Sequence, residues 1–247
     1  MLQNNVDILC TKEIDPRLVV RAAGRQINIE PIPFIRIEQV VSYELSKKIS
    51  TSALNPATVI FTSVHAVECI MPFLEGMRPS WKIFCTAPAT AMIVTQLMPG
   101  TTIIGTAANA VALAQVISEN AIEEKFLFFC GDKRRDELPE ILIGKGYEVE
   151  SFVVYKTVET PTLVSGNYNA IAFFSPSAVN SFFSMNIPDE KAILFAIGNT
   201  TADAIRKRSD NRIIVNETTN TESVIDTIID YFKDQPSETF NDDEKKL

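Results

Sequence analysis

The stretch Phe61-Thr-Ser-Val-His-Ala-Val67 returns later in the chain as Phe173-Phe-Ser-Pro-Ser-Ala-Val179, at an offset of 112 residues. Each copy begins with apolar residues that are typical of a buried strand, and a serine and a helical pattern follow. Serine is a favoured helix N-cap, and the proline in Ser175-Pro176 suits the first position of a helix. Both stretches therefore predict a strand that runs directly into a helix, as in a βαβ unit.

Three further blocks repeat in the same order, at offsets between 110 and 120 residues. They pair Ile83–Ala91 with Leu194–Ala202, Ile103–Ile117 with Ile213–Ile228, and Val6–Cys10 with Phe126–Cys130. At the last of these spacings, Ile27–Phe34 also falls opposite Tyr147–Val154. This ordered set predicts two similar α/β domains that arose by duplication. The alternative is the ordinary self-similarity of any chain in which strands and helices alternate.

Short runs rich in apolar residues predict the strands. They are Val6–Cys10, Thr58–Thr62, Trp81–Cys85, Thr102–Ile104, Phe126–Cys130, Ala170–Phe174, Ala192–Ile197 and Arg212–Val215. Strands that alternate with helices of roughly 10–15 residues are typical of parallel sheets that are buried on both faces. The predicted fold class is therefore α/β, with two similar parallel-sheet domains.

Composition and charge exclude several classes of function. Hydrophobic residues make up 46% and charged residues 22% of the 247 residues, close to the globular averages of roughly 45–50% and 25%. The net charge is −8, and the densest basic run, Lys133–Arg135, is flanked by acidic residues, so we expect no nucleic-acid partner. No apolar run approaches the ~18 residues of a membrane span, and Met1–Asp7 does not resemble a signal peptide. We therefore expect a cytoplasmic protein that does not bind membranes.

Searches for metal and cofactor motifs fail. The four cysteines form no Cys-x-x-Cys pair and His65 is the only histidine, so no zinc site is expected. The only Gly-x-Gly, Gly144–Gly146, precedes a predicted strand, so it cannot hold a pyrophosphate at a helix start. We expect no metal and no cofactor, and we place His65 on a solvated first helical turn.

Candidate helix N-caps remain as possible binding groups. They are Asp15, Ser63, Thr90, Asn109, Ser175, Thr200 or Thr201, and Thr219 with Glu222 in a capping box. In parallel sheets such caps lie at the carboxyl edge of the strands, where ligands usually bind. A helix N-terminus presents unpaired amides and about half a positive charge, so even an acidic protein can bind carboxylates there. The alternative is that these residues only cap their helices.

Two further features have two interpretations each. The segment Gly131–Pro139 follows a predicted strand and begins a helix, and its basic residues either face an anion or form surface pairs with neighbouring acids. Tyr155, at the end of the run Val149–Tyr155, is either a core aromatic or a hydroxyl donor directed into a cleft.

Together these motifs resemble the uroporphyrinogen-III synthase family from about Val6 to Phe232. The resemblance rests on an ordered set of short motifs: Phe61-Thr-Ser63 with Ala66-Val67, Pro88–Ala91, Gly131-Asp132 with Arg135 and Leu138-Pro139, Gly146–Val149 with Val154–Thr157, Phe174–Val179, and Ile197–Ala202. It implies residues 1–31 plus 158–233 as one discontinuous domain and residues 38–148 as the second. Two antiparallel linker strands, 29–37 and 149–157, would join them, and 234–247 reads as a disordered tail.

The resemblance also implies a reaction. A lyase of this family cyclises hydroxymethylbilane, a linear tetrapyrrole with eight carboxylates, to uroporphyrinogen III. Water is lost, ring D is inverted through a spiro intermediate, and no cofactor is used. The active site would lie in the cleft between the domains of a monomer. Tyr155 matches the family's cleft tyrosine and is the candidate proton donor, and the implied substrate contacts are Lys12, Ser63, Thr90, Asn109, Arg135, Ser175, Ser177, Thr200 and Thr201.

Some positions depart from the family pattern. Thr11-Lys12-Glu13 stands where the family often has Thr-Arg-Pro, so a cation is kept without the guanidinium fork. Cys130 stands where Arg is common, and Ala87 replaces a glycine that the second copy keeps as Gly198. These departures leave a second hypothesis open, a non-catalytic two-domain α/β module that binds an anionic small molecule. A structural partner protein is the third, and no coiled-coil pattern supports it.

Overall fold

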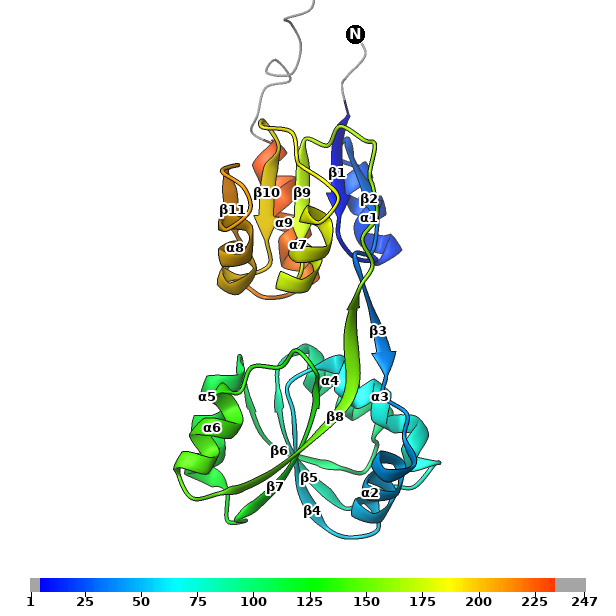
Figure 1. Cartoon of the computed structure of the whole chain (residues 1–247), viewed down its shortest axis with the longest axis vertical. Coiled ribbons are helices and arrows are strands. Elements are labelled where there is room, and N and C mark those ends of the chain that lie inside the picture. Colours follow the sequence, from blue (N-terminus) through cyan, green and yellow to red (C-terminus); the bar gives the residue numbers. More distant parts are fainter. Residues whose placement is uncertain (1–4, 234–247) are drawn as a thin grey trace, which may run out of the picture. The chain divides into compact units, whose positions relative to one another are not determined.

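The computed structural model of the chain describes residues 5–233, and the chain divides into two compact units (Figure 1). Unit 1 comprises Met1–Arg36 and Glu159–Leu247, and unit 2 comprises Ile37–Val158. The predicted disordered tail, 234–247, lies outside the described residues. None of the helices within residues 5–233 combines the length and the apolar character that a membrane span needs.

Unit 1 is a five-stranded sheet in the order β11-β10-β9-β1-β2, in which every neighbouring pair is parallel. Each strand except β2 leads into a helix within the unit. The elements are β1 (Val6–Cys10), α1 (Pro16–Ala23), β2 (Ile27–Pro31), β9 (Ala170–Phe173), α7 (Pro176–Phe183), β10 (Ile193–Ala196), α8 (Asn199–Arg206), β11 (Ile213–Val215) and α9 (Thr221–Lys233).

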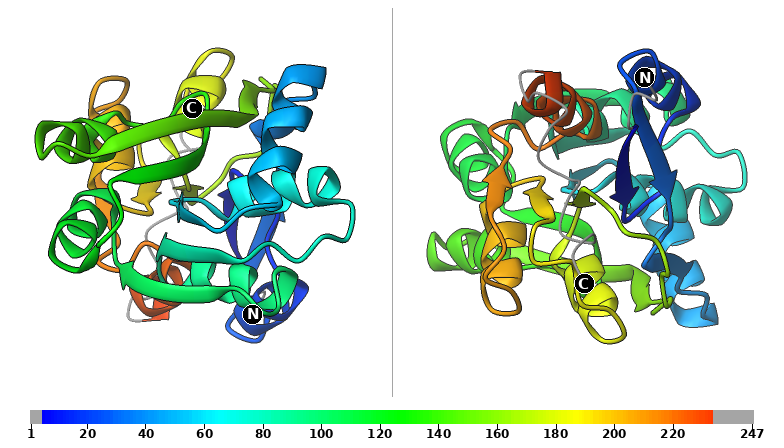
Figure 2. Two further views of the ribbon diagram at one scale, coloured as in Figure 1. Left: turned by 90° about the horizontal axis from the view of Figure 1, so that it is seen from below. Right: turned by 90° about the horizontal axis from the view of Figure 1, so that it is seen from above.

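Helices cover both faces of this sheet (Figures 1 and 2). Residues of α1 and α9, such as Ala22 and Ile225, pack with Ile8 on one face. Residues of α7 and α8 pack with Leu9 on the other. Because successive strand residues point to opposite faces, both Ile8 and Leu9 are buried. This explains why Ile8, Leu9 and Cys10 form a continuous apolar run that does not alternate.

Unit 2 contains a six-stranded sheet in the order β3-β8-β7-β4-β5-β6. The pairs from β8 to β6 are parallel, whereas the arrows of β3 and β8 point in opposite directions in Figure 1. The elements are β3 (Ile35–Gln39), α2 (Tyr43–Ala53), β4 (Ala57–Phe61), α3 (Val64–Leu74), β5 (Trp81–Thr86), α4 (Ala89–Leu97), β6 (Thr102–Ala107), α5 (Ala110–Asn120), β7 (Lys125–Gly131), α6 (Glu137–Gly144) and β8 (Glu148–Glu159).

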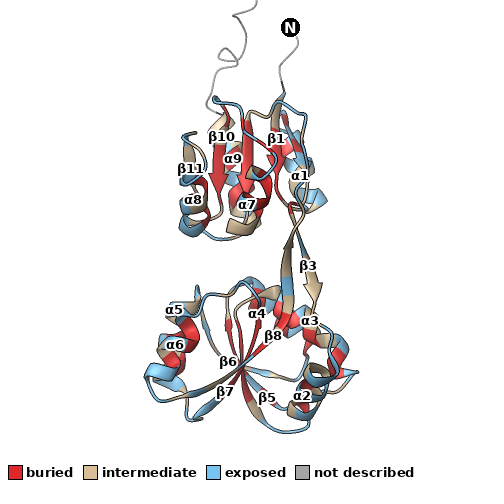
Figure 3. Cartoon of the chain, viewed as in Figure 1, coloured by how far each residue is buried: buried red, intermediate tan, exposed pale blue. Residues whose placement is uncertain are grey.

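The core of unit 2 also has two layers. Helices α2, α3 and α4 pack on one face of the sheet and α5 and α6 on the other. On the first face Phe129 has ring centroids of Phe61, Trp81 and Phe152 within 5.2–5.7 Å. Figure 3 shows the buried residues concentrated on the strands and on the sheet-facing sides of the helices. This packing fixes the strand ends from which the candidate site is built.

The two sheets share one topology, and this confirms the prediction of two similar parallel-sheet α/β units. In unit 1 the order places β2, β1, β9, β10 and β11 side by side. In unit 2 the strands in the equivalent places are β8, β7, β4, β5 and β6. These are the strands that the sequence repeat matched, at offsets from 110 to 120 residues. The equivalence holds although the chain visits the strands of unit 2 in another order.

Some predicted boundaries differ from the structure. Residues 29–37, expected as one linker strand, instead divide between the end of β2 and the start of β3. Pro31 and Pro33 lie near the break, and proline has no amide for a strand ladder. The strand expected to end at Ile104 continues to Ala107, with a register shift between Ile83 and Phe84 of its partner β5.

Candidate functional site

Each sheet reverses its strand order at one point. In unit 1 the point lies between β1 and β9, and in unit 2 between β7 and β4. The helices that follow the two strands at each point pack on opposite faces. In open parallel sheets this geometry leaves a crevice beyond the carboxyl ends of the strands, where ligands bind. The candidate residues below are those placed at these two edges.

Ser63 forms the centre of the edge of unit 2. It is the N-cap of α3, and its Oγ accepts a hydrogen bond from the backbone amide of His65 at 3.2 Å. The same oxygen accepts a hydrogen bond from the Tyr155 hydroxyl at 3.1 Å. The predicted cap is therefore confirmed, and its oxygen also holds the candidate proton donor.

Tyr155 reaches Ser63 because of a glycine. β8 places Tyr155 beside Gly131, the last residue of β7. A Cβ atom on Gly131 would lie 2.5 Å from ring atoms of Tyr155, a distance that no side chain can occupy without displacing the ring. Asp132 extends the contact, because its amide donates to the Tyr155 carbonyl at 3.0 Å and its Oδ1 accepts from the Thr157 amide at 2.9 Å.

Burial keeps Tyr155 neutral. The low-dielectric surroundings disfavour the phenolate and raise the pKa of Tyr155 above its ordinary value of 10. The hydrogen bond with Ser63 lowers the pKa by a smaller amount. The hydroxyl is therefore a neutral donor throughout the physiological pH range. The Tyr155 ring packs against the core of unit 2, as the first interpretation expects, and its hydroxyl lies at the strand edge beside Ser63. A hydroxyl directed into a cleft stays a prediction.

His65 lies beside this hydroxyl. Its ring meets the Tyr155 ring edge-on, with the centroids 5.8 Å apart, and its Nδ1 lies 3.3 Å from Glu68 Oε2. The side chain is 48% exposed, as the expectation of a solvated first helical turn requires. The contact with Tyr155 was not predicted, because nothing in the sequence places β8 next to the start of α3.

Thr90 and Asn109 follow the next two strands of unit 2. Asn109 caps α5 as predicted, and its Oδ1 accepts from the Ala112 amide at 2.9 Å. Thr90 is not a cap: α4 begins at Ala89, and Thr90 is buried in the first turn with its Oγ1 3.1 Å from Thr86 Oγ1. The prediction failed here because Pro88 takes the cap position.

The segment Gly131–Pro139 begins a helix as expected, since α6 starts at Glu137, and its basic residues lie in the loop before that helix. Arg134 lies 3.2 Å from Asp136 and Arg135 3.7 Å from Glu137, as the interpretation of surface pairs expects. An anion contact of these residues stays a prediction. The Arg135 side chain is 54% exposed and that of Arg134 only 25%. The more enclosed guanidinium is thus that of Arg134, although Arg135 is the predicted substrate contact.

Cys130 stands where the resemblance implies an arginine, and it offers no cation that could bind an anion. Its thiol is buried against the sheet and lies 3.5 Å from the Phe152 carbonyl oxygen. Burial raises the pKa of this thiol to about 11. Cys130 therefore stays neutral and fills the core under the strand edge.

Lys12 is the cation of the edge of unit 1. It follows β1, and its Nζ lies 3.4 Å from Thr221 Oγ1 and 5.6 Å from the centroid of the Phe174 ring. Partial burial lowers the pKa of Lys12 below its usual value. The preceding residue, Thr11, is buried and donates its hydroxyl to the Ala172 carbonyl at 2.9 Å, which ties β1 to β9 at the reversal point.

Ser175 repeats the role of Ser63. It caps α7 directly after β9, with its Oγ accepting from the Ala178 amide at 3.1 Å and Pro176 in the first helical turn. Ser177 is the second residue of α7 and is half-buried. The predicted cap and helix start are confirmed.

Three threonines expected as caps in unit 1 do not have that role. Helix α8 begins at Asn199, with Gly198 as its N-cap, so Thr200 and Thr201 both lie in the first turn. Helix α9 begins at Thr221, and the oxygen that caps it belongs to Asn220, which accepts from the Ser223 amide at 2.8 Å. The capping box of Thr219 with Glu222 was therefore wrong. The sequence repeat could have predicted the correct cap, because it aligns Asn220 with Asn109, which caps α5.

The two edges thus use equivalent residues. Ser63 and Ser175 cap the helices after the strands at the reversal points, and Asn109 and Asn220 cap the helices after the outermost strands. Thr90 and Thr201 are both buried in a first helical turn. Nine of the ten predicted site residues lie in the turns or first helical turns beyond the strand ends. Tyr155 is the exception, because it is part of β8.

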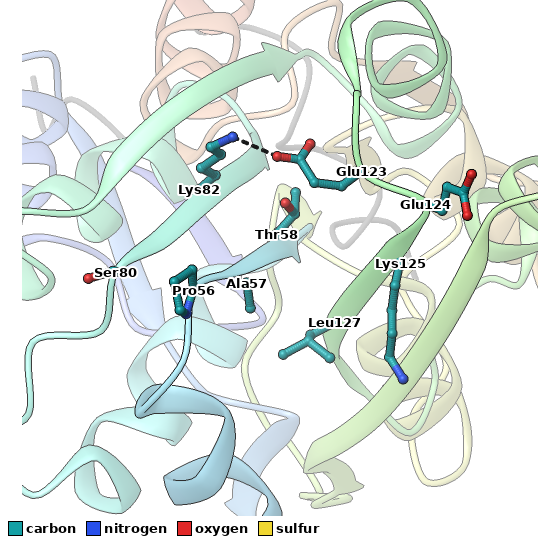
Figure 4. Close-up of a pocket in the computed structure, with 9 residues that line it drawn as sticks. All are labelled: Pro56, Ala57, Thr58, Ser80, Lys82, Glu123, Glu124, Lys125 and Leu127. Carbon is teal, nitrogen blue, oxygen red and sulfur yellow. Dashed lines mark hydrogen bonds and ion pairs between the residues drawn. The ribbon is translucent and has the colours of Figure 1, made fainter.

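A separate hollow of about 620 Å³ lies at the opposite edge of the unit 2 sheet, at the amino ends of β4, β5 and β7 (Figure 4). One pair of its charged groups is in contact, with Lys82 Nζ 2.6 Å from Glu123 Oε1. Its lining residues are Pro56, Ala57, Thr58, Ser80, Lys82, Glu123, Glu124, Lys125 and Leu127. None of them belongs to the edge that carries the helix N-termini. Within residues 5–233 no group of three or more potential metal-ligating His, Cys, Asp or Glu residues occurs.

Comparison with known proteins gives two kinds of match. A family model described as "Uroporphyrinogen-III synthase HemD" matches residues 17–226. The structure of uroporphyrinogen-III synthetase from Helicobacter pylori is similar, with 15% identity and a TM-score of 0.66, over 92% of this chain and 99% of that one. A mutant uroporphyrinogen III synthase from the extremely thermophilic bacterium Thermus thermophilus has 16% identity and a TM-score of 0.62, over 93% and 100%. At these identities the structures establish a shared fold.

Proposed function

Since the chain belongs to the uroporphyrinogen-III synthase family, whose members cyclise hydroxymethylbilane to uroporphyrinogen III, we propose that it acts as a cyclising hydro-lyase through its two strand-end edges. The substrate is a linear tetrapyrrole with eight carboxylates. The reaction removes water from its hydroxymethyl group, inverts ring D through a spiro intermediate and closes the macrocycle. Without the enzyme, the linear tetrapyrrole closes to isomer I, in which ring D is not inverted. The enzyme must therefore hold the two reacting ends of the substrate in the arrangement that leads to isomer III.

The repeated cap at the two reversal points is the observation that carries the proposal. A substrate with many carboxylates needs many anion-binding groups, yet the protein has a net charge of −8. Helix N-termini supply such groups without basic side chains, because their first amides are unpaired and the helix dipole is positive there. Ser63 and Ser175 each cap such a terminus at the point where the strand order of their sheet reverses.

The proposed substrate contacts divide between the units. In unit 2 they are Ser63, Thr90, Asn109 and Arg135, and in unit 1 they are Lys12, Ser175, Ser177, Thr200 and Thr201. Their hydroxyls and amides can donate to acetate and propionate oxygens. Buried Thr90 and Thr201 act mainly by shaping the first turns of α4 and α8, whose backbone amides then contact the carboxylates.

Tyr155 is the proposed catalytic residue. Its hydroxyl donates its proton to the departing hydroxyl as the carbon–oxygen bond breaks, so that the group leaves as water. The phenolate then regains the proton that the tetrapyrrole loses when the macrocycle closes. Because burial raises the pKa of Tyr155, the hydroxyl carries its proton at neutral pH. Ser63 holds the hydroxyl in place until the substrate replaces it as acceptor.

Lys12 should contribute through charge. We expect Lys12→Ala to raise KM about fivefold with kcat within twofold, because it removes a partly buried cation that binds substrate and transition state alike. Lys191→Ala is the control, because Lys191 is exposed and precedes β10 at the other end of the strands.

The lowered pKa of Lys12 also predicts a pH dependence. As the pH rises, Lys12 should lose its proton at a lower pH than a lysine with the ordinary pKa, so the wild-type KM should begin to rise at that lower pH. A KM equal to that of the control would remove Lys12 from the site.

The proposal is tested with hydroxymethylbilane generated in situ by a coupled assay. The purified protein is expected to yield uroporphyrinogen III above the spontaneous isomer I background, as separated chromatographically after oxidation. Isomer I alone, with tight binding of the substrate, would instead favour the non-catalytic anion-binding module. No observation on the described residues favours that module over the enzyme.

We propose further that the protein works as a monomer in a reducing, cytoplasmic setting, without nucleic acid. Its four cysteines are free, and Cys10, Cys85 and Cys130 are buried, which fits a compartment in which disulfides are rare. Light scattering at assay concentration tests the oligomeric state: a single species of 27.4 kDa is expected.

A further inference from the structure

We propose that His65 is a further substrate-binding residue of this enzyme, and that its imidazolium binds one substrate carboxylate beside the Tyr155 hydroxyl. The proposal rests on the function proposed above and names one contact of the same site. It starts from the position of the residue: His65 is the second residue of α3, as Ser177 is of α7. The repeat aligns the same two residues, and Ser177 is a proposed substrate contact.

The geometry places the imidazole in the immediate surroundings of the reacting group. Ser63 Oγ accepts from both the His65 amide and the Tyr155 hydroxyl, so one oxygen connects the two residues. The rings of His65 and Tyr155 also meet edge-on at 5.8 Å. A carboxylate held by His65 would therefore lie close to the bond that Tyr155 helps to break.

Glu68 orients the ring. Its Oε2 lies 3.3 Å from Nδ1, and a hydrogen bond at one ring nitrogen determines what the other can do. With Nδ1–H directed at Glu68, Nε2 is the nitrogen available to the substrate, and the 48% exposed side chain leaves it accessible. Protonation at Nε2 turns it into a charged donor, which forms stronger hydrogen bonds to carboxylates than a neutral one.

Charged and polar groups surround the imidazole on the elements packed against it. Glu68 lies beside it on α3, and the start of that helix has the positive end of the amide dipoles. From β8 the facing group is Tyr155, which stays neutral, with Asp132 behind it on the loop after β7. Histidine is the side chain that ordinarily changes its charge between about pH 5 and 8. A contact that depends on the charge of an imidazole is therefore tested at one acidic and one alkaline pH.

The test is the affinity for uroporphyrin III, the fluorescent oxidised form of the product, which keeps all eight carboxylates. Affinity is measured at pH 6 and pH 8.5 for the wild type, His65→Asn and His65→Arg. Asparagine keeps a polar side chain without charge, and arginine keeps the charge at both pH values. We expect His65→Asn to weaken binding about fivefold at pH 6 and hardly at pH 8.5, and His65→Arg to bind tightly at both.

The outcomes separate this inference from the enzyme assignment. If the wild type makes isomer III but His65→Asn keeps the wild-type affinity and pH profile, the inference is wrong and the function stands. If affinities follow the expected pattern but no isomer III forms, the catalytic assignment fails and the carboxylate contact remains. A purely structural role for His65 would lower binding equally at both pH values, and arginine would not restore it. That result also overturns the inference.

Discussion

Replacing Tyr155 with phenylalanine is expected to lower kcat for uroporphyrinogen III formation about 100-fold, with KM within twofold of the wild type. The substitution removes only the hydroxyl, and donation of a proton or hydrogen bond in the transition state typically contributes a factor of this size. The Tyr155 ring still packs against the core of unit 2, so the fold should be retained. A loss in kcat without a change in KM is the signature of an interaction made in the transition state.

The matched control is Tyr147→Phe. Tyr147 also packs by its ring, edge-on to Phe126 at 5.4 Å, but lies before β8 begins, at the other end of that strand. It should keep full activity. Both variants are compared by initial rates and by the ratio of isomer III to isomer I. If Tyr155→Phe retains the rate of the control, Tyr155 is not the group that assists departure of the hydroxyl, although the family assignment survives.

Gly131→Ala is expected to lower kcat between about 10- and 100-fold, because a small displacement of a catalytic group is costly. The new methyl group would lie 2.5 Å from the Tyr155 ring and 2.8 Å from its hydroxyl, so the ring must shift from the position in which its hydroxyl contacts Ser63. Gly131 is itself buried, and the crowding should also reduce stability by about 1–3 kcal/mol. Denaturant unfolding measures that cost separately from activity.

Two variants make this prediction specific. Gly144→Ala introduces the same methyl group at the end of α6, where no other atom lies within 4 Å, so it should leave kcat unchanged and cause no loss of stability. The double variant Gly131→Ala with Tyr155→Phe should have the kcat of Tyr155→Phe alone, because both changes act on one hydroxyl. Additive losses would show that Gly131 has a role independent of Tyr155.

Most of the architecture was predictable because the same order of strand and helix patterns occurs twice in the sequence. The apolar runs of Val6–Cys10 and Phe126–Cys130 become central strands, and their offset predicts equivalent places in two sheets. A buried parallel strand has no polar face, so its sequence is distinctive. Helix starts were predictable where a side-chain oxygen caps the helix, as with Ser63, Asn109 and Ser175.

The errors have local causes. Thr90 and Thr201 resemble helix caps in the sequence, but the cap positions belong to Pro88 and Gly198. Thr90 follows its cap by two residues and Thr201 by three, and both are buried. Asn220, not Thr219, caps α9, because the choice between neighbouring polar residues depends on backbone angles that a pattern does not show. An error of a few residues in a predicted helix start therefore assigns to a binding surface a hydroxyl that is in fact buried in the core.

The contacts that define the site were beyond pattern analysis. Tyr155 and Ser63 are 92 positions apart, and their hydrogen bond depends on β8 pairing with β7 and on the absence of a side chain at Gly131. His65 was predicted only to lie on an exposed turn. Its neighbour Tyr155 follows from the sheet order, and no spacing in the sequence encodes that order.

The central claim is that both strand-end edges, one in each unit, bind carboxylates of the same substrate. The most direct test is the affinity for uroporphyrin III of Ser63→Phe and Ser175→Phe, with Ser42→Phe as the control. Ser42 is also a helix N-cap, accepting from the Leu45 amide, but it follows β3, which is not one of the repeated strands. The account predicts that blocking either edge weakens binding about tenfold, as expected for a lost charge-assisted contact, while the control binds as the wild type does. If either edge variant binds as tightly as Ser42→Phe, the two-edge account is contradicted.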